Sequence, residues 1–222
     1  MPMGRILFAV IASTLPLAAQ WGRVNTAAAP GPTTSAPMTY DLLRGHTLLL
    51  DGSQLWSFDG STWTAIASAH QPPGLPGTTM EYDIATGWAM LYGGIPPSSS
   101  STPNSNETWI WDGTDWSQGV GGPPPLARYA MAYDLLRQRT VLFGGIQNVY
   151  VTSSISPQTW EFDGTTWSLS NTNTPGARER HSMCFSIALG RTVMFGGSDM
   201  PNGPFGKRSW SKKPHAAGRR SR

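Results

Sequence analysis

Large apolar residues alternate with polar ones over short runs that recur along the chain. At four places a methionine is followed two residues later by an aromatic residue, so both side chains project to one face of a strand. These pairs are Met38 and Tyr40, Met80 and Tyr82, Met131 and Tyr133, and Met183 and Phe185. A second apolar run follows each pair, at 46–50, 88–92, 139–143 and 191–195. The period of two predicts four pairs of β-strands.

A second motif, Trp-x-x-Asp-Gly-x-x-Trp, occurs three times, with starts 53 and 51 residues apart. Asp-Gly between aromatic flanks predicts a hairpin with a two-residue type I′ turn. In the third copy, this turn would place Trp160 directly opposite Trp167. The alternation then puts Phe162 on the same face as both tryptophans, a face that we expect to be buried. The tryptophans and turn glycines of the three copies are Trp56, Gly60, Trp63, Trp109, Gly113, Trp116, Trp160, Gly164 and Trp167.

Each repeat therefore contains four short strands, and a unit of this size cannot bury its alternate apolar residues alone. It needs a neighbour stacked face to face, which predicts the blades of a β-propeller. Three repeats are complete, and a fourth has three strands that end near Trp210. The second strand ends in Gly-Gly in three repeats, where the chain must turn without crowding; these are Gly93, Gly94, Gly144, Gly145, Gly196 and Gly197. Asp51-Gly52 takes that place in the first repeat.

The third repeat carries the fullest pattern. Residues 128–145 follow Arg-x-x-Met-x-Tyr-Asp-x-x-Arg-x-Arg-Thr-Val-Leu-Phe-Gly-Gly, and residues 159–167 are Thr-Trp-Glu-Phe-Asp-Gly-Thr-Thr-Trp. This resembles a kelch repeat of the kind found in galactose oxidase-type β-propellers. The resemblance covers roughly residues 36–210. It implies an all-β fold of kelch-type blades of four antiparallel strands, with about three and a half blades present. It implies much less about function, because one fold hosts many.

Propellers usually have about four to eight blades, so the repeat count leaves three interpretations open. The chain is a truncated or frame-shifted product that lacks later blades. Alternatively, residues 21–24 supply the missing fourth strand of the last repeat and close a ring of four, because Trp21 precedes Tyr40 by the same 19 residues that separate Trp63 from Tyr82. In the third, exposed blade faces stack between chains, and the protein associates with itself.

The N-terminus has the pattern of a secretion signal. Arg5 is followed by apolar runs at 6–12 and 15–19, with no further charge until Arg23. A membrane anchor would need about 20 consecutive apolar residues, so we expect a signal peptide at 1–19 that is cleaved after Ala19. The predicted organisation is then a propeller segment at 20–210 and a disordered basic tail at 211–222. We expect an exported protein, secreted, periplasmic or at the cell surface, with no membrane span after cleavage.

Composition supports this picture. Among 222 residues there are 25 Gly, 19 Pro and 10 Trp; Gly and Pro disfavour long helices, and the aromatic content argues against disorder. The net charge of +3 is misleading, because residues 207–222 hold seven Lys and Arg and no acid. Without them, nine basic residues stand against thirteen acidic ones. No nucleic-acid partner is therefore expected for the body of the protein.

Two arginines are the tentative ligand-binding residues. We call the aromatic residue of each Met-x-aromatic pair the anchor of its repeat; the anchors are Tyr40, Tyr82, Tyr133 and Phe185. Arg128 and Arg180 each stand five residues before an anchor, at the position that Ser35 and Gly77 occupy in the other two repeats. The resemblance to kelch proteins implies that such residues enter the first strand and hydrogen-bond across neighbouring blades. Binding of an anion or a carboxylate is the alternative role.

The sequence nominates no catalytic residue, metal ligand or cofactor site. The histidines, His46, His70, His181 and His215, have no metal-ligand spacing, and Cys184 is the single cysteine. No pair of carboxylates and no Gly-x-Ser-x-Gly elbow is evident. We expect a non-catalytic module that recognises protein or glycan. The loops at 95–107, 146–158 and 198–207 are either contact sites or simple spacers. The alternative is an inactive fragment of a propeller enzyme related to galactose oxidase.

Overall fold

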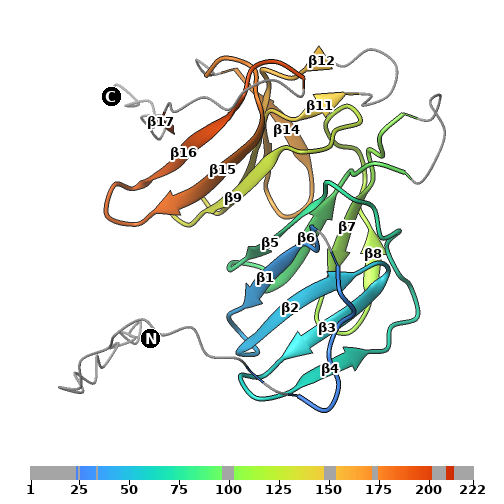
Figure 1. Ribbon diagram of the computed structural model, residues 1–222. Coiled ribbons are helices and arrows are strands. Elements are labelled where there is room, and N and C mark those ends of the chain that lie inside the picture. The colour runs from blue at the N-terminus through green and yellow to red at the C-terminus, as the bar shows by residue number, and fades with distance from the viewer. Residues whose placement is uncertain are drawn as a thin grey trace, which may run out of the picture.

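The computed structural model describes residues 24, 26–33, 35–96, 103–147, 154–171 and 175–201, together with the backbone of 209–212. Within these residues every regular element is a β-strand (Figure 1). No helix that is long and apolar enough to cross a membrane is found in the same residues. The predicted signal peptide, the strand proposed at 21–24 except for Val24, and residues 213–222 lie outside the described part of the chain.

Four antiparallel sheets follow one another along the chain, and each is a blade. Blade 1 contains β1 (Met38–Asp41), β2 (His46–Asp51), β3 (Gln54–Phe58) and β4 (Trp63–Ile66). Blade 2 contains β5 (Thr79–Asp83), β6 (Trp88–Tyr92), β7 (Thr108–Trp111) and β8 (Trp116–Gln118). Blade 3 contains β9 (Ala130–Asp134), β10 (Arg139–Phe143), β13 (Thr159–Phe162) and β14 (Trp167–Ser170). Blade 4 has the three strands β15 (Glu179–Ser186), β16 (Arg191–Ser198) and β17 (Ser209–Lys212).

Every blade is a meander in which each strand pairs with the next strand of the same blade. The predicted strands and the three-and-a-half-blade count are confirmed. β17 takes in two residues, Ser211 and Lys212, that the sequence analysis assigned to the tail. A small hairpin of β11 (Ile146–Gln147) and β12 (Ser154–Ile155) adds a further pair of strands within the loop of blade 3.

The Asp-Gly turns differ from the predicted two-residue form. In blade 3, Phe162 and not Trp160 lies opposite Trp167. The N–H of Asp163 donates to the carbonyl oxygen of Thr166 at 3.2 Å, so the turn has four residues. Its cause is the aspartate side chain, whose Oδ1 accepts the N–H groups of Thr165 and Thr166 at 3.0 and 2.8 Å. Blades 1 and 2 repeat this arrangement at Asp59 and Asp112.

The shift moves the register by two residues, and a shift of two leaves every side chain on its predicted face. Trp160, Phe162 and Trp167 therefore share one face, as expected. The ring centroids of Phe162 and Trp167 are 5.2 Å apart. Equivalent pairs occur in blade 1, between Phe58 and Trp63 at 5.0 Å, and in blade 2, between Trp111 and Trp116 at 5.6 Å.

Two hydrophobic cores lie between the blades. The first consists of Leu48, Leu50 and Leu55 of blade 1 and Met80, Tyr82, Ala89, Leu91, Trp111 and Trp116 of blade 2. The second consists of Met90 and Tyr92 of blade 2 and Leu126, Tyr129, Met131, Leu142 and Phe162 of blade 3. In both cores the following blade contributes its aromatic face and the preceding blade contributes its other face. Full burial of one such side chain stabilises the fold by about 1.5–3 kcal/mol.

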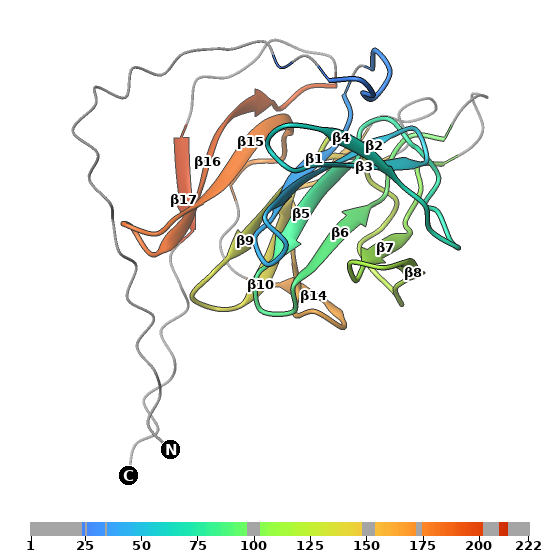
Figure 2. The ribbon, with the colours of Figure 1, turned by 90° about the horizontal axis from the view of Figure 1, so that it is seen from below.

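Blade 1 has no preceding blade among the described residues. Its aromatic residues Trp56, Phe58 and Trp63 are only partly buried, and its anchor Tyr40 is exposed. Trp109, Trp160 and Trp167 of the inner blades are also only partly buried, whereas Trp111, Trp116 and Phe162 are buried. The expectation of a fully buried aromatic face in every repeat is therefore corrected. The inner strands β1, β5, β9 and β15 lie side by side in that order (Figure 2). The sheets form an open array that does not close into a ring.

The glycine pairs are required because backbones of neighbouring blades meet there. A Cβ atom on Gly144 would lie 2.4 Å from the carbonyl oxygen of Arg178, at the entry to the next blade. The N–H of Gly145 donates to that same oxygen at 2.9 Å. Gly93 and Gly94 make the equivalent approach to Leu126. In blade 4, strand β16 continues through Gly196 and Gly197 to Ser198, so this pair does not end the strand as predicted.

Candidate functional site

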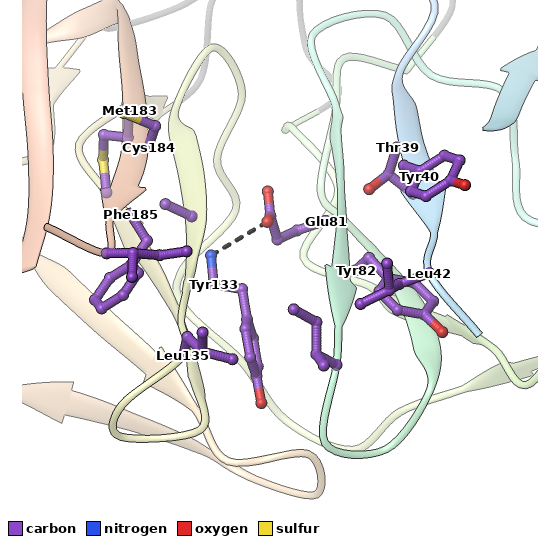
Figure 3. Close-up of a pocket in the computed structure, with 13 residues that line it drawn as sticks. Thr39, Tyr40, Leu42, Glu81, Tyr82, Tyr133, Leu135, Met183, Cys184 and Phe185 are labelled. Atoms are coloured by element: carbon purple, nitrogen blue, oxygen red, sulfur yellow. Dashed lines mark hydrogen bonds between the residues drawn. The ribbon is translucent and has the colours of Figure 1, made fainter. Parts of the chain in front are cut away.

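The inner strands end around an open pocket with a volume of about 420 Å³ (Figure 3). Each blade contributes its aromatic anchor, the residue before that anchor and the residue two positions after it. These residues are Thr39, Tyr40 and Leu42; Glu81, Tyr82 and Ile84; Ala132, Tyr133 and Leu135; and Cys184, Phe185 and Ile187, with Met183 added in blade 4. We call this the axial pocket, because equivalent positions of all four blades converge on it.

Only the position before the anchor changes its chemistry from blade to blade. It is Thr39, Glu81, Ala132 and Cys184 in blades 1 to 4. The other positions stay aromatic or aliphatic. A repeated frame thus supplies apolar walls, and one variable position supplies the polar groups.

Glu81 is the carboxylate among the residues that line the axial pocket. Its Oε1 accepts the backbone N–H of Tyr133 at 3.2 Å, across the boundary between blades 2 and 3 (Figure 3). Burial raises the pKa of Glu81 to about 7, because removal from water disfavours the charged form. The side chain therefore changes between a hydrogen-bond donor and an anion near neutral pH.

Tyr82 and Tyr133 form aromatic walls whose hydroxyl groups are already engaged. The Tyr82 hydroxyl accepts the N–H of Leu43 at 3.2 Å, and the Tyr133 hydroxyl accepts that of Ala85 at 3.2 Å. Each bond joins an anchor to the β-turn of the preceding blade. Burial, helped by the neighbouring Asp83, raises the pKa of Tyr133 to about 12, so its phenol stays protonated and serves as structure.

Arg128 and Arg180 lie at the entry to the inner strands and do not line the axial pocket. Both have positive φ, 57° and 55°, as do Ser35 and Gly77 at the equivalent positions, with 67° and 77°. The N–H of Arg128 donates to the carbonyl oxygen of Gly77 at 3.0 Å. The position therefore serves a backbone crossing between blades.

The guanidinium of Arg128 also reaches the next blade. Its Nη1 lies 3.2 Å from Oε2 of the fully buried Glu179. This ion pair matches the cross-blade role that the resemblance implied. Ligand binding by Arg128 or Arg180 stays a prediction.

The histidines occupy separate sites in the described part of the chain, where no group of three or more His, Cys, Asp or Glu could hold a metal ion. His181 is buried beside Phe143, with ring centroids 5.5 Å apart. Burial, with the nearby Arg178, lowers its pKa to about 4, so the imidazole is neutral near pH 7. Cys184 is exposed on β15, which forms one edge of the sheet of blade 4.

A second pocket, with a volume of about 450 Å³, lies at blade 2, with His70, Trp109, Asp112 and Asp115 in its lining. The Nδ1 atom of His70 lies 2.7 Å from Oδ2 of Asp115. Hydrogen bonds from His70 lower the pKa of Asp115 to about 2. The Asp112 carboxylate caps its own turn, so both carboxylates of this pocket already have partners within the protein.

The loops proposed as contact sites lie partly outside the described residues, and their role stays a prediction. One described contact anchors the first of them. The buried Asn104 side chain donates to the carbonyl oxygen of Ile146 at 2.7 Å, so the returning half of this loop is fixed to blade 3.

The anchors Tyr40, Tyr82, Tyr133 and Phe185 were predicted from the sequence, but their position around a pocket was not. Glu81 was not predicted either. A signal was present, because Glu81 is the charged residue at the position before the anchor, where the other repeats have Thr, Ala and Cys.

Comparison with known proteins supports the architecture alone. No protein-family model matches the sequence, and no curated protein does. A solved structure titled "Structure of YjhT" superposes with a TM-score of 0.54 at 15% sequence identity. The match covers 71% of this chain and 48% of the other. The chain is therefore similar to part of that structure, spans about half its length, and has an all-β fold of propeller-type blades.

Proposed function

We propose that this protein is an exported, non-catalytic recognition module built of kelch-type blades, and that it binds a glycan in the axial pocket. The observation that carries the proposal is a protonatable carboxyl group, Glu81, set among aromatic and aliphatic walls. Sugar rings present apolar C–H faces that pack on aromatic side chains and hydroxyl groups that need polar partners. The pocket volume of about 420 Å³ lies in the range usual for small-ligand sites.

The charge of the lining selects among sugars. Glu81 is the ionisable group there that becomes an anion near pH 7, whereas the arginines Arg128 and Arg180 lie outside the lining. An anionic sugar would meet repulsion when Glu81 is ionised. We therefore expect neutral or amino sugars to bind better than sugars that carry a carboxylate.

A recognition role suits the site better than hydrolysis of a glycosidic bond. The usual hydrolytic mechanisms need two carboxyl groups about 5–10 Å apart, one on each side of the bond. Among the described residues that line the axial pocket, Glu81 is the one carboxyl group.

An oligosaccharide array tests the proposal, with the unmodified chain, Glu81→Ala and Glu81→Gln as probes. Glu107→Gln is the matched control, since Glu107 lies outside the pocket and accepts a hydrogen bond from the Trp109 indole. We expect signals on neutral or amino sugars and an affinity about tenfold or more lower in Glu81→Ala. Failure of every sugar to bind, or equal binding by Glu81→Ala, would refute the glycan proposal.

Export is tested separately by expression of the full chain in a secreting host and sequencing of the N-terminus of the released protein. The proposal predicts a new N-terminus at Gln20. Retention of residues 1–19 on a cytoplasmic protein would contradict it.

A further inference from the structure

The two ends of the blade array expose residues whose equivalents in the inner blades are buried. Met38 and Tyr40 on the aromatic face of blade 1 are 58% and 52% exposed, whereas their equivalents in blade 2, Met80 and Tyr82, are 2% and 5% exposed. The difference arises because blade 2 has a preceding blade and blade 1 has none in the described chain. The face of blade 1 thus resembles the buried faces of the inner blades but has no neighbouring blade among the described residues.

Blade 4 shows such exposure at the other end of the array. Phe195 is 58% exposed, whereas Phe143, the equivalent residue of blade 3, is 3% exposed because blade 4 covers it. Cys184 is exposed on the same face, while its equivalent Ala132 is buried. The far face of blade 4 therefore has no following blade within the part of the chain that the structure describes.

The glycines of the Asp-Gly turns also differ between blade 1 and the inner blades. The turn glycines Gly113 and Gly164 lie under Arg44 and Thr86, which belong to the first turn of the preceding blade. A Cβ atom on Gly60, the equivalent in blade 1, would meet nothing within 4 Å.

The hydroxyl groups of the anchors differ in the same way. Those of Tyr82 and Tyr133 accept an N–H from the first turn of the preceding blade. Tyr40 has the same hydroxyl group on an exposed side chain. In blade 4, the position equivalent to Leu43 and Ala85 is the exposed Ala188.

From these matched positions we infer that a second copy of this chain completes the propeller. Blade 4 of each copy packs on blade 1 of the other by the contact that already joins blades 1 to 4 within the chain. The Tyr40 hydroxyl then accepts the N–H of Ala188 of the partner subunit. Two such contacts about a two-fold axis close a ring of eight blades, the upper end of the usual range of about four to eight.

The four inner strands β1, β5, β9 and β15 line the axial pocket, which is open (Figure 3). A second copy would supply four further inner strands and enclose the pocket.

The oligomeric state of the full chain, measured by size-exclusion chromatography with light scattering, tests this inference. We expect the mass of two chains, constant as concentration rises. Met38→Lys and Phe195→Glu each place a charge on one half of the interface at an exposed position, so both should fold and elute as single chains. Val120→Lys is the control, because Val120 is 82% exposed and on neither face; it should keep the two-chain mass.

Two further measurements identify the contact. A mixture of Met38→Lys and Phe195→Glu chains keeps one unaltered contact, so it should recover a two-chain species that neither variant forms alone. The Cys184 thiol should react with a maleimide at least about tenfold more slowly in the two-chain species than in Phe195→Glu, because the equivalent Ala132 is buried.

Three results would overturn the inference. A folded single chain with a fully reactive Cys184 would show that no second copy occupies these faces. A mass that grows with concentration would mean head-to-tail stacking that does not close. Persistence of the two-chain mass in both Met38→Lys and Phe195→Glu would place the contact elsewhere.

Discussion

The backbone N–H of Arg180 donates to the carbonyl oxygen of Arg128 at 2.8 Å, and both arginines adopt a left-handed backbone conformation. The same conformation at Gly77 brings its carbonyl oxygen to the N–H of Arg128. The crossing from one blade to the next thus depends on a backbone strained for a non-glycine residue by about 1–2 kcal/mol. The packing of the blades offsets that strain.

This strain can be measured at Arg180 by comparison of two variants that both remove the side chain. Arg180→Gly should be more stable than Arg180→Ala by about 1 kcal/mol in urea unfolding, because only glycine adopts φ of 55° without cost. The matched pair at Arg139, inside strand β10, should show the reverse order. Equal stability of the two Arg180 variants would contradict the account of the crossing.

Gly144 tests the close approach between blades 3 and 4. Gly144→Ala would place a Cβ atom 2.4 Å from a backbone oxygen at a residue with φ of 71°, so we expect a loss of roughly 3 kcal/mol or more. Gly52→Ala has a similar φ, 57°, and an empty surrounding, so its cost should be the backbone strain alone, about 1–2 kcal/mol. Chemical denaturation measures both. Similar losses in the two variants would show that the blades do not meet at Gly144.

His181 predicts acid sensitivity. Its pKa falls from 6.5 to about 4 on folding because burial and Arg178 disfavour the imidazolium. The unfolded chain therefore binds more protons between these values, and stability is lost as the pH falls from 6.5 toward 4. The full loss from this group is roughly 3 kcal/mol. In His181→Phe, unfolding curves measured across this range should lack that loss; an unchanged pH dependence would place the acid sensitivity in other groups.

The effect of Glu81 on the pH dependence of stability is opposite to that of His181. The pKa of Glu81 rises from 4.5 to about 7 on folding, so the folded chain holds the extra proton, and stability falls as the pH rises from 4.5 through 7. Glu81→Gln should be more stable than the unmodified chain at pH 8 and close to it at pH 4. Thermal unfolding at the two values checks this. A variant that is less stable at pH 8 would mean that the carboxylate is stabilised as an anion.

Much of the fold follows from alternation along the sequence. The spacing of Met131 and Tyr133 by two residues, and of Trp160 and Phe162, fixed which residues share a face, and faces determine how blades stack. The register of the hairpin did not follow, because Asp-Gly suits two turns. The Asp163 side chain accepts hydrogen bonds from the backbone N–H groups of Thr165 and Thr166 and so stabilises the four-residue turn over the two-residue turn. The Asp-Gly dipeptide alone does not show which of the two turns forms.

The axial pocket followed from the sequence only in part. The anchors were identified from their repeat positions, but their convergence depends on the curvature of the array, which arises from packing between blades. Glu81 differs from its equivalents in the other repeats, and only the structure shows that burial raises its pKa. One residue in the sequence indicated the left-handed backbone at Arg128 and Arg180, because the equivalent position in another repeat is a glycine, Gly77.

Peroxide oxidation of equivalent methionines, followed by mass spectrometry of the peptides, tests the stacking of blades most directly. The variant Phe195→Glu is suited to it, because its blade 1 face should remain open. Met38 is 58% exposed, and Met80 and Met131 are 2% and 3% exposed. The account predicts that Met38 is oxidised at least about tenfold faster than the other two. Equal rates at the three positions in the folded protein would contradict face-to-face packing of the repeats.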